Sequence, residues 1–233
     1  MDTGGTSSLT PLLLQERVTS STSIHIFGAG LNQERPAHQA VKEVSHRGWA
    51  CIPIHPTDGG ATVAGFPIRP SLDQGLVPEI VVLFLAPDRA RAVVRDLIIR
   101  LDHEHFPLVW FQRGAEDPSS IEALQSMGAA YVIDDCIVEY TNRHDLRCTS
   151  SPLPQMFCLQ TASEDGDGCS VWTVHSTGDA ALVKPTYALE WVGTLDDLEH
   201  SNHTIPRYIR SLQATNESLA SLAQRLTQTE ATS

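Results

Sequence analysis

The sequence is short of paired cysteines and long apolar runs, and each shortage excludes a class of protein. Its five cysteines are an odd number and form no C-x-x-C pair, which argues against a disulfide framework or a zinc ribbon. No stretch approaches the roughly 20 apolar residues of a membrane span. The short run Leu12-Leu13-Leu14 follows no basic cluster, so it does not fit a secretory signal. We therefore expect a soluble, cytoplasmic protein with no membrane partner.

Positive charge is also scarce. The 233 residues carry 16 Lys and Arg against 28 Asp and Glu, which gives a formal net charge of −12. Nucleic-acid binding depends on basic surfaces, so this acidic chain is not expected to bind nucleic acid. The hydrophobic content of 41% is enough for a packed core, so we expect a folded chain rather than a disordered one.

Strand-like and helix-like patterns alternate along the first part of the chain. Short apolar runs predict strands at residues 23–27, 49–54, 80–85, 108–111 and 130–133. Apolar residues at helical spacing predict helices at residues 36–47, 87–101 and 118–127. Such alternation is typical of βαβ units. We therefore predict an α/β fold, a Rossmann-like doubly wound parallel sheet whose ligand lies beyond the carboxyl ends of the strands.

The composition changes near residue 148, where small residues and two prolines resemble a linker. We predict a first domain of residues 1–148 and a C-terminal α+β extension of residues 149–233. Strand-like runs in the extension predict a small antiparallel sheet or hairpin at residues 155–160, 170–175 and 186–192. A single helix is predicted at residues 206–227.

Four residues of this C-terminal region recur every seven positions: Ile205, Leu212, Leu219 and Leu226. A seven-residue apolar repeat is typical of a helix face that packs against another element. The stripe favours two interpretations equally, packing within the chain and a self-association seam of a dimer.

The first predicted strand opens into Gly28-Ala29-Gly30-Leu31-Asn32-Gln33. A glycine after the strand allows a tight turn, and a second small residue lets a phosphate approach the backbone amides beside a helix N-terminus. The dinucleotide motif is G-x-G-x-x-G, and Gln33 stands at its third glycine. The turn therefore predicts either a phosphate site or a strand-to-helix turn without a ligand.

The tip of the second strand distinguishes among nucleotide binders, because NAD-binding proteins place Asp or Glu there for the ribose hydroxyls. This chain has Ile54-His55-Pro56 at that point, and Asp58 lies beyond the proline. An NAD(P)-dependent oxidoreductase is therefore the least favoured of the functions considered. No nucleophile–base pair, G-x-S-x-G elbow or P-loop is found, so we predict a binding protein rather than an enzyme.

The ordered segments resemble those of stand-alone CoA-binding-domain proteins. The resemblance covers about residues 10–145 and is carried by IFGAG, GWACIPIHP, AGFPIRPSL, FLAP, WFQRG and VIDDC. The same Rossmann-type domain is similar to the CoA-binding part of succinyl-CoA synthetase. The resemblance implies CoA or an acyl-CoA across the strand ends. The residues that it assigns to this ligand are Gly28, Ala29, Gly30 and Arg35 for the phosphates, Asn32 as a further cofactor-binding residue, His55 and Pro56 for the nucleotide, Phe84, Ala86 and Pro87 for the adenine side, and Gln112 and Gly114 for the pantetheine path.

Several positions depart from the family pattern. Gly30 stands where the family has Ser, His55 where it has Asn, Leu85 where it has Arg, and Asp135 where it often has Arg. Polar or cationic ligands of an anionic cofactor are therefore missing. The groups available to compensate are Arg35, Arg113 and a protonated His55.

Two functions follow from this pattern. The leading hypothesis is non-catalytic binding of CoA or acyl-CoA through the Gly-rich turn. The alternative is a protein-interaction or scaffold protein on a degenerate Rossmann fold, with the extension as its partner surface.

Two smaller features complete the sequence analysis. Cys136 follows Asp134 and Asp135, and neighbouring carboxylates raise the pKa of a thiol, so a structural cysteine is favoured. The redox alternative for Cys136 is a mixed disulfide with the CoA thiol. His103-Glu104-His105 lacks a third ligand, so no metal site is predicted.

Overall fold

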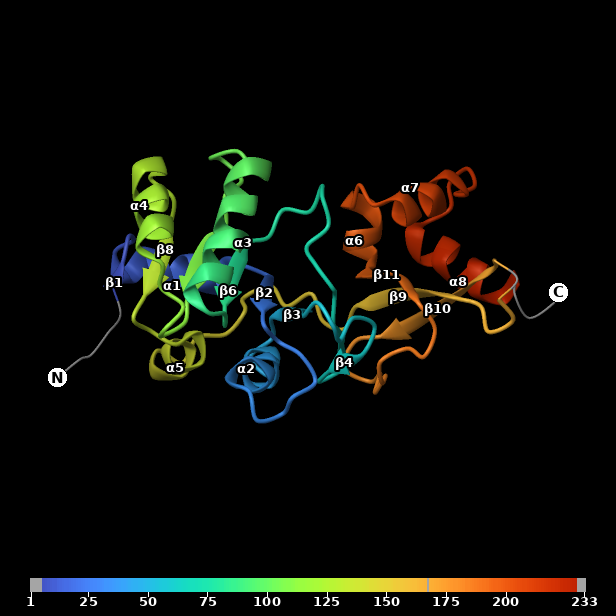
Figure 1. Cartoon of the computed structure of the whole chain (residues 1–233), viewed down its shortest axis with the longest axis horizontal. Helices are drawn as coiled ribbons and strands as arrows, with labels where there is room; N and C mark the ends of the chain where they lie inside the picture. Colours follow the sequence, from blue (N-terminus) through green and yellow to red (C-terminus); the bar gives the residue numbers. More distant parts are fainter. Residues whose placement is uncertain (1–5, 167, 230–233) are drawn as a thin grey trace. The chain divides into compact units, whose positions relative to one another are not determined.

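The computed structural model describes residues 6–166 and 168–229, which form two compact units (Figure 1). The first unit comprises the chain up to Pro53 together with Val77–Leu153. The second comprises Ile54–Leu76 and the residues from Pro154 onward. The domains predicted with a boundary at residue 148 stay a prediction, but Ile54–Leu76 lies with the C-terminal residues and not with the segments that flank it in sequence.

The first unit is built on a six-stranded sheet in the order β1-β8-β7-β6-β2-β3. Its strands are β1 (Thr6–Ser7), β2 (Ser23–Phe27), β3 (Ala50–Ile54), β6 (Ile80–Leu83), β7 (Leu108–Phe111) and β8 (Tyr131–Ile133). Five of them are parallel, and β1 pairs antiparallel with β8. The Rossmann-like α/β prediction is confirmed. Because the strand order reverses between β2 and β6, the switch point of the sheet lies between these two strands.

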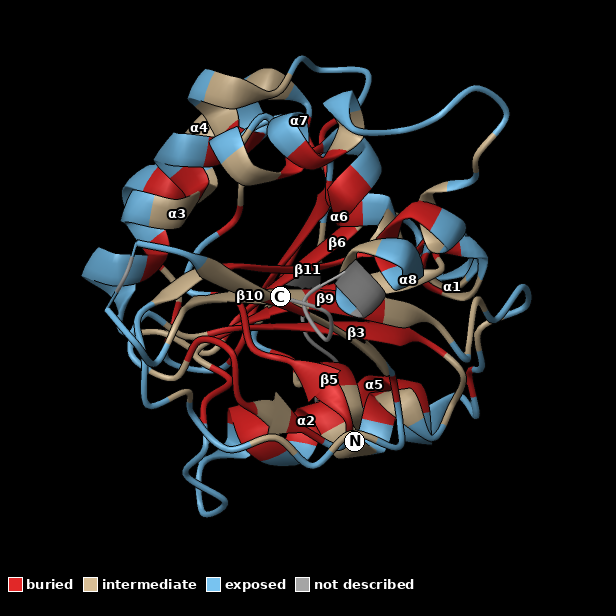
Figure 2. Cartoon of the chain, turned by 90° about the vertical axis from the view of Figure 1, so that its right-hand side faces the viewer, coloured by how far each residue is buried: buried red, intermediate tan, exposed pale blue. Residues whose placement is uncertain are grey.

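Helices cover both faces of this sheet. They are α1 (Pro11–Ser20), α2 (Pro36–Ser45), α3 (Pro87–Arg100), α4 (Pro118–Met127) and α5 (Ile137–Arg143). Helices α3 and α4 lie side by side on one face, and α2 and α5 on the other (Figures 1 and 2). The predicted helix at residues 118–127 is confirmed, and Gly128 ends it with φ 67°. The sequence analysis missed α1 and α5.

The core of the first unit consists of the apolar runs that predicted the strands. Every residue of β3, β6 and β7 is buried, and the strands labelled β3 and β6 are red in Figure 2. Trp110 and Phe111 are completely inaccessible to solvent. A strand covered on both faces needs apolar residues at every position, which explains the unbroken runs in the sequence.

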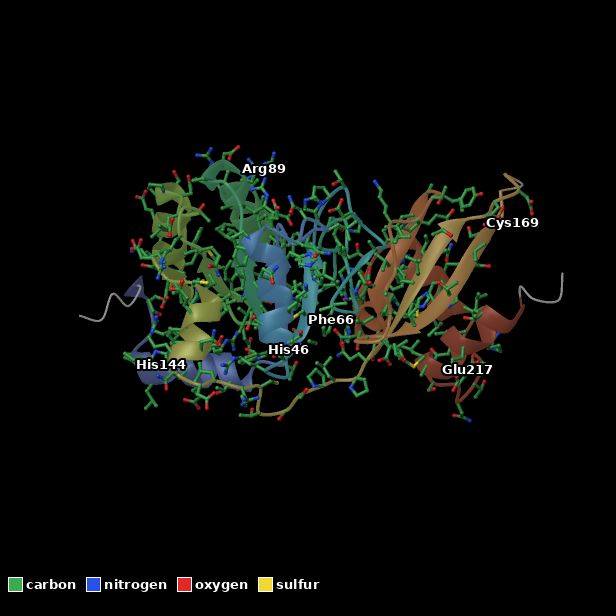
Figure 3. All side chains as sticks on the ribbon, turned by 90° about the horizontal axis from the view of Figure 1, so that it is seen from below. His46, Phe66, Arg89, His144, Cys169 and Glu217 are labelled. Atoms are coloured by element: carbon green, nitrogen blue, oxygen red, sulfur yellow. The ribbon has the colours of Figure 1, made fainter. Side chains whose placement is uncertain are left out.

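The second unit contains a three-stranded antiparallel sheet in the order β10-β9-β11. Its strands are β9 (Met156–Ala162), β10 (Ser170–Ser176) and β11 (Leu189–Thr194), and a separate hairpin is formed by β4 (Thr62–Val63) and β5 (Phe66–Pro67). The antiparallel sheet predicted for the extension is confirmed. Cys169 lies in the turn that joins β9 to β10 (Figure 3).

The single helix predicted at residues 206–227 is wrong. Three helices complete the second unit: α6 (Leu195–His200), α7 (Thr204–Ser211) and α8 (Leu219–Thr229). The break between α7 and α8 contains Asn216, which has φ 63°, a left-handed conformation that no helix continues. The backbone N–H of Ser221 then donates to the Ser218 hydroxyl at 3.1 Å, which caps the start of α8.

The apolar stripe of this region packs within the chain. Ile205, Leu219 and Leu226 are partly buried against a cluster that contains Trp172 and Trp191. Leu212, the fourth residue of the stripe, is 37% exposed because it lies where α7 ends. The dimer seam stays a prediction. None of the described helices is long and apolar enough to cross a membrane.

Candidate functional site

The loops after β2 and β6 meet at the switch point. Phe27 pairs with Leu83 at the ends of these parallel strands, and the N–H of Phe84 donates to the Phe27 carbonyl at 3.1 Å. Gly28 has φ +91°, and a Cβ atom there would lie 2.4 Å from the Phe84 carbonyl oxygen. Glycine is therefore required at this position by the close approach of the two strands themselves.

This contact changes how Gly28 is interpreted. The sequence analysis assigned Gly28 to the phosphates, and that role stays a prediction. A side chain at Gly28 would first collide with the backbone of the neighbouring strand. A substitution there therefore tests the sheet before it tests a ligand site.

The next two amides of the loop have no acceptor among the described residues. Ala29 and Gly30 are buried, and their N–H groups donate to no acceptor within the residues that the structure describes. Buried backbone N–H groups are nearly always hydrogen-bonded in native proteins. N–H donors without an acceptor at the switch point of an α/β sheet suit an anionic ligand.

Asn32 shapes this loop with both of its oxygens. Its side-chain Oδ1 accepts the N–H of Glu34 at 3.0 Å, and its backbone carbonyl accepts the N–H of Arg35 at 3.1 Å. The side chain of Asn32 is therefore used within the loop. Its assignment to the ligand stays a prediction.

His38 also belongs to the site, and the sequence analysis missed it. It is 5% exposed, and its Nδ1 lies 2.9 Å from the Gly30 carbonyl oxygen. A carbonyl oxygen only accepts, so Nδ1 carries the hydrogen and fixes the loop to α2. The available signal was a histidine beside Ala37 and before Ala40 and Val41, on the apolar side of a helix.

The helices that follow the two switch-point strands begin without side-chain caps. The N-cap residues are Arg35 for α2 and Ala86 for α3, and neither side chain bonds to its helix. By contrast, Asp117 caps α4 by accepting the N–H of Ser120 at 2.9 Å. An uncapped helix start keeps its partial positive charge available to an anion. Helix α2 begins only at Pro36, so the Gly-rich turn leads into a loop before the helix.

The three cationic groups expected to compensate for missing ligands differ in their partners. The guanidinium of Arg113 lies 2.9 Å from the carboxylate of Glu139, and His55 Nδ1 lies 3.2 Å from that of Asp58. Arg35 is exposed and forms no ion pair among the described residues. Arg35 is thus the group whose charge is not already matched by a carboxylate of the chain.

Gln112 and Gly114 follow β7, and they differ in whether their hydrogen-bond donors already have a partner. Gln112 is 5% exposed, and its Nε2 has no hydrogen-bond partner within the described part of the chain. Its backbone N–H donates to the Leu83 carbonyl at 3.3 Å, which places it at the end of β6. The N–H of Gly114 is occupied, because it donates to Glu116 Oε2 at 2.6 Å. Gln112 therefore keeps donors for a ligand, and the Gly114 amide does not.

The remaining assigned residues lie on two different units. Phe84 is half-buried, and Ala86 and Pro87 are exposed at the start of α3, all in the first unit. His55 and Pro56 belong to the second unit, so their grouping with the others stays a prediction.

Asp135 and Cys136 form part of a local ion-pair cluster. Asp135 is buried, and its Oδ2 accepts from Arg143 at 2.6 Å, so this departure from the family pattern has its own cationic partner. Half-buried Cys136 is the N-cap of α5, and its N–H donates to Asp135 Oδ1 at 2.9 Å. Burial and the Asp135 carboxylate raise the pKa of Tyr140 to about 12, and Arg143 opposes them. The redox role of Cys136 stays a prediction. The described residues contain no group of three or more metal-ligating side chains.

Comparisons with known proteins agree with this geometry. A family model described as a CoA binding domain matches residues 22–141. A solved structure from Thermus thermophilus, titled cell-free ID.343, is 24% identical, covers 58% of this chain and 98% of its own, and has a TM-score of 0.52. A hypothetical protein from Pyrococcus horikoshii OT3 is 25% identical, covers 58% of this chain and 92% of its own, and has a TM-score of 0.50. A search of curated proteins finds no match.

Proposed function

This chain belongs to the CoA binding domain family, whose model matches more than half of it, and from that premise we propose that it binds CoA or an acyl-CoA without catalysing a reaction on it. The family supports binding of a CoA-related ligand in general. The proposal adds the place, which is the Gly-rich turn after β2. It also adds the non-catalytic role, because the sequence offers no nucleophile–base pair.

One observation carries the proposal. Ala29 and Gly30 present buried N–H groups that no described residue accepts, and they do so at the switch point between β2 and β6. A pyrophosphate supplies acceptor oxygens and negative charge for these amides and for the uncapped starts of α2 and α3. The unpartnered Nε2 of Gln112 is a donor for an amide carbonyl of the pantetheine arm.

The direct test is calorimetric titration of the full chain with CoA, acetyl-CoA and NAD⁺. We expect binding of the first two and none of the third. Absence of heat and of a thermal shift at millimolar CoA would remove the proposal. Native mass spectrometry of the purified protein supplies an independent measurement, because a retained CoA adds its own mass to that of the chain.

Arg35 supplies a variant that tests the same site without disturbing the sheet. Loss of a charge-assisted hydrogen bond weakens binding by about tenfold or more, so Arg35→Ala should raise the Kd for CoA by at least that factor. The matched control is Arg95→Ala, since Arg95 is an exposed arginine in the middle of α3. Equal Kd values for the two variants would remove Arg35 from the site.

A further inference from the structure

The second unit encloses a cavity that is separate from the site described above. Its lining residues come from the segment Ile54–Leu76 and from β11, α6 and the start of α7, and all of them belong to this one unit. The cavity has a volume of about 100 Å³, which is smaller than the pockets that hold drug-sized molecules. It therefore suits a ligand with only a few heavy atoms.

A buried ion pair fixes one wall of this cavity. Arg69 is 3% exposed; its Nε donates to Asp197 Oδ2 at 2.9 Å, and its Nη2 donates to the same oxygen. That oxygen also accepts the N–H of Thr194 at 2.7 Å, in the capping box that starts α6. A buried charge that loses its partner is strongly destabilising, so the pair holds the segment Ile54–Leu76 against α6. The pair is neutral as a whole.

Trp191 forms an aromatic wall of the cavity. Its side chain is buried and stacks on Trp172, with ring centroids 6.0 Å apart and an angle of 2° between the rings. Its indole N–H donates to Asp73 Oδ2 at 3.0 Å, which fixes the orientation of the ring. Among aromatic side chains, the indole ring attracts cations most strongly. The cavity therefore has a rigid surface that favours a positive charge.

Carboxylates outnumber basic groups in the lining. Besides the ion pair, the cavity is lined by two further carboxylates, Asp73 and Glu190, and by no other Lys or Arg of the described chain. The imidazole of His203 adds no charge, because its Nδ1 accepts the N–H of Ile205 at 3.3 Å and therefore carries no hydrogen. The lining thus has three negative charges against one positive charge, which favours a cation over an anion.

Glu190 is the carboxylate best suited to receive this cation. It is half-buried, and its Oε2 accepts from the Gln160 amide at 2.8 Å and from the Ser170 hydroxyl at 2.7 Å. Both donors are neutral, and Glu190 forms no ion pair within the part of the chain that the structure describes. Withdrawing a carboxylate from water costs free energy unless a positive group faces it. A bound cation would therefore stabilise this part of the unit.

The size of the cation follows from the spacing of the ligating groups. The described residues contain no group of three or more His, Cys, Asp or Glu side chains that could hold a metal ion. An organic cation is larger, so it can contact a single carboxylate and the indole ring together. Leu76 and Leu189 also line the cavity and supply apolar contacts for its carbon atoms.

We propose that this cavity binds a small organic cation with one ammonium or guanidinium group, with Glu190 as its counter-ion and Trp191 as its aromatic wall. The inference does not rest on the proposed function, because no residue of the cavity belongs to the first unit. Failure of the chain to bind CoA would leave this inference unchanged.

The test titrates the full chain with propylammonium and with 1-propanol at constant ionic strength. The two molecules share a propyl chain and differ in charge. The readout is the NMR signal of the Trp191 indole N–H, which Trp191→Phe identifies by its disappearance. We expect propylammonium to shift this signal in a saturable manner at millimolar concentrations, and 1-propanol to leave it unchanged.

Two variants then test the counter-ion. Glu190→Gln keeps the shape of the side chain and an acceptor for Gln160 and Ser170, but it removes the charge. The matched control is Glu217→Gln, which removes a carboxylate of the same unit that pairs with Arg225 and does not line the cavity. Loss of a charge-assisted hydrogen bond weakens binding by about tenfold or more, so Glu190→Gln should raise the Kd for propylammonium by that factor. Glu217→Gln should leave this Kd unchanged.

Three results would overturn the proposal. The first is an equal response to propylammonium and 1-propanol, and the second is an equal Kd for Glu190→Gln and Glu217→Gln. If Glu190→Gln does not fold, Ser71→Lys replaces it, because exposed Ser71 lines the cavity and lysine there adds a competing positive charge. An unchanged Kd for Ser71→Lys is the third result.

Discussion

The loops that follow β2 and β3 start from neighbouring strands of one parallel sheet, and they use their polar groups in opposite ways. The loop after β2 leaves the N–H groups of Ala29 and Gly30 without acceptors among the described residues. The loop after β3, Ile54–Leu76, is bonded partly to the extension, as Thr62 and Asp73 show, and partly within itself, as the bond from Gly60 N–H to the Ile68 carbonyl shows. Both loops lie within the family match.

This difference shows how the extension contributes to the loop after β3 in this chain. A loop at a strand tip is free to contact a ligand only as long as nothing else satisfies its backbone. In this chain, residues of the extension bond to Thr62, Asp73 and Gln74 in the loop after β3. The loop after β2 is the place that the proposed function assigns to the phosphates.

The largest expected effects come from substitutions of glycine. Three glycines form a series, because their φ angles are similar and the atoms around them differ. A Cβ atom meets the Phe84 carbonyl at Gly28 (φ +91°), the Pro185 ring at Gly60 (φ +85°), and nothing within 4 Å at Gly114 (φ +87°). Alanine at Gly114 should cost about 1 kcal/mol for backbone strain alone. Gly28→Ala should cost about 3 kcal/mol or more, with Gly60→Ala between them. Urea denaturation of the three variants gives these free energies of unfolding.

The decisive result is the order of the three losses in free energy of unfolding. Backbone atoms of a sheet cannot move aside, whereas the Pro185 ring lies in a loop. Equal costs at Gly28 and Gly114 would show that strand contact does not require the first glycine, and the phosphate interpretation would then regain that position.

A substitution of Gln112 should affect stability and ligand affinity in opposite directions. Its buried Nε2 has no partner among the described residues, so Gln112→Met removes a polar group that costs free energy to bury. The free energy of unfolding of the ligand-free protein should stay level or rise by about 1 kcal/mol. The Kd for CoA should rise about tenfold, because the ligand loses a donor. Calorimetry and chemical denaturation measure the two effects.

A lower stability of the ligand-free Gln112→Met variant would contradict this account, since it would show that Nε2 already has a partner in the protein. A matched control is Gln125→Met, because the Gln125 side chain is exposed on α4 and donates to Tyr131 Oη at 2.7 Å. That variant should leave the Kd unchanged.

The smallest expected effect concerns a carboxylate outside both loops. Glu217 is labelled in Figure 3. The hydrogen bonds from the Arg225 side chain and from the backbone N–H of Ala214 lower the pKa of Glu217 to about 2, against its ordinary value of 4.5. A carboxylate with a lowered pKa in the folded state stabilises the protein fully above its unfolded pKa. This contribution should therefore be complete above pH 4.5 and lost as the pH falls through about 2.

Thermal unfolding of the wild type and of Glu217→Gln at several pH values measures this effect. The two proteins should differ near neutral pH and converge toward pH 2. A difference that does not change with pH would show that the ion pair between Glu217 and Arg225 contributes nothing through charge.

Much of the first unit was predictable from the sequence for a physical reason. The run from Leu108 to Phe111 is apolar at every position and bounded by Pro107 and Gln112, so both its type and its ends could be read correctly. Helix α4 begins at Pro118 and ends at Gly128, which mark its bounds. Helix α1 was missed because Leu12 and Leu13 are exposed, and its apolar residues therefore follow no single buried face.

The unpredicted features depend on contacts between residues far apart in the chain. Nothing near Arg69 in the sequence indicates that its partner is Asp197. The assignment of Ile54–Leu76 to the second unit could therefore not be predicted from the local sequence. The break at Asn216 is different, because Thr215 and Asn216 were visible in the sequence and the apolar stripe outweighed them. The position of the Gly-rich turn was predicted from the motif, whereas the bond from His38 to Gly30 needed coordinates.

The segment Ile54–Leu76 is far in sequence from the residues against which it packs, and this separation has a consequence for the nascent chain. Arg69 is made 128 residues before Asp197, and ribosomes add about 5–20 residues per second, so the loop exists for on the order of ten seconds before its ion pair can form. During translation, Arg69 and the hairpin of β4 and β5 therefore stay exposed to solvent until the residues that they contact have been synthesised. Ribosome stalling after β8 would therefore yield a nascent polypeptide with its parallel strands complete and this one segment still unstructured.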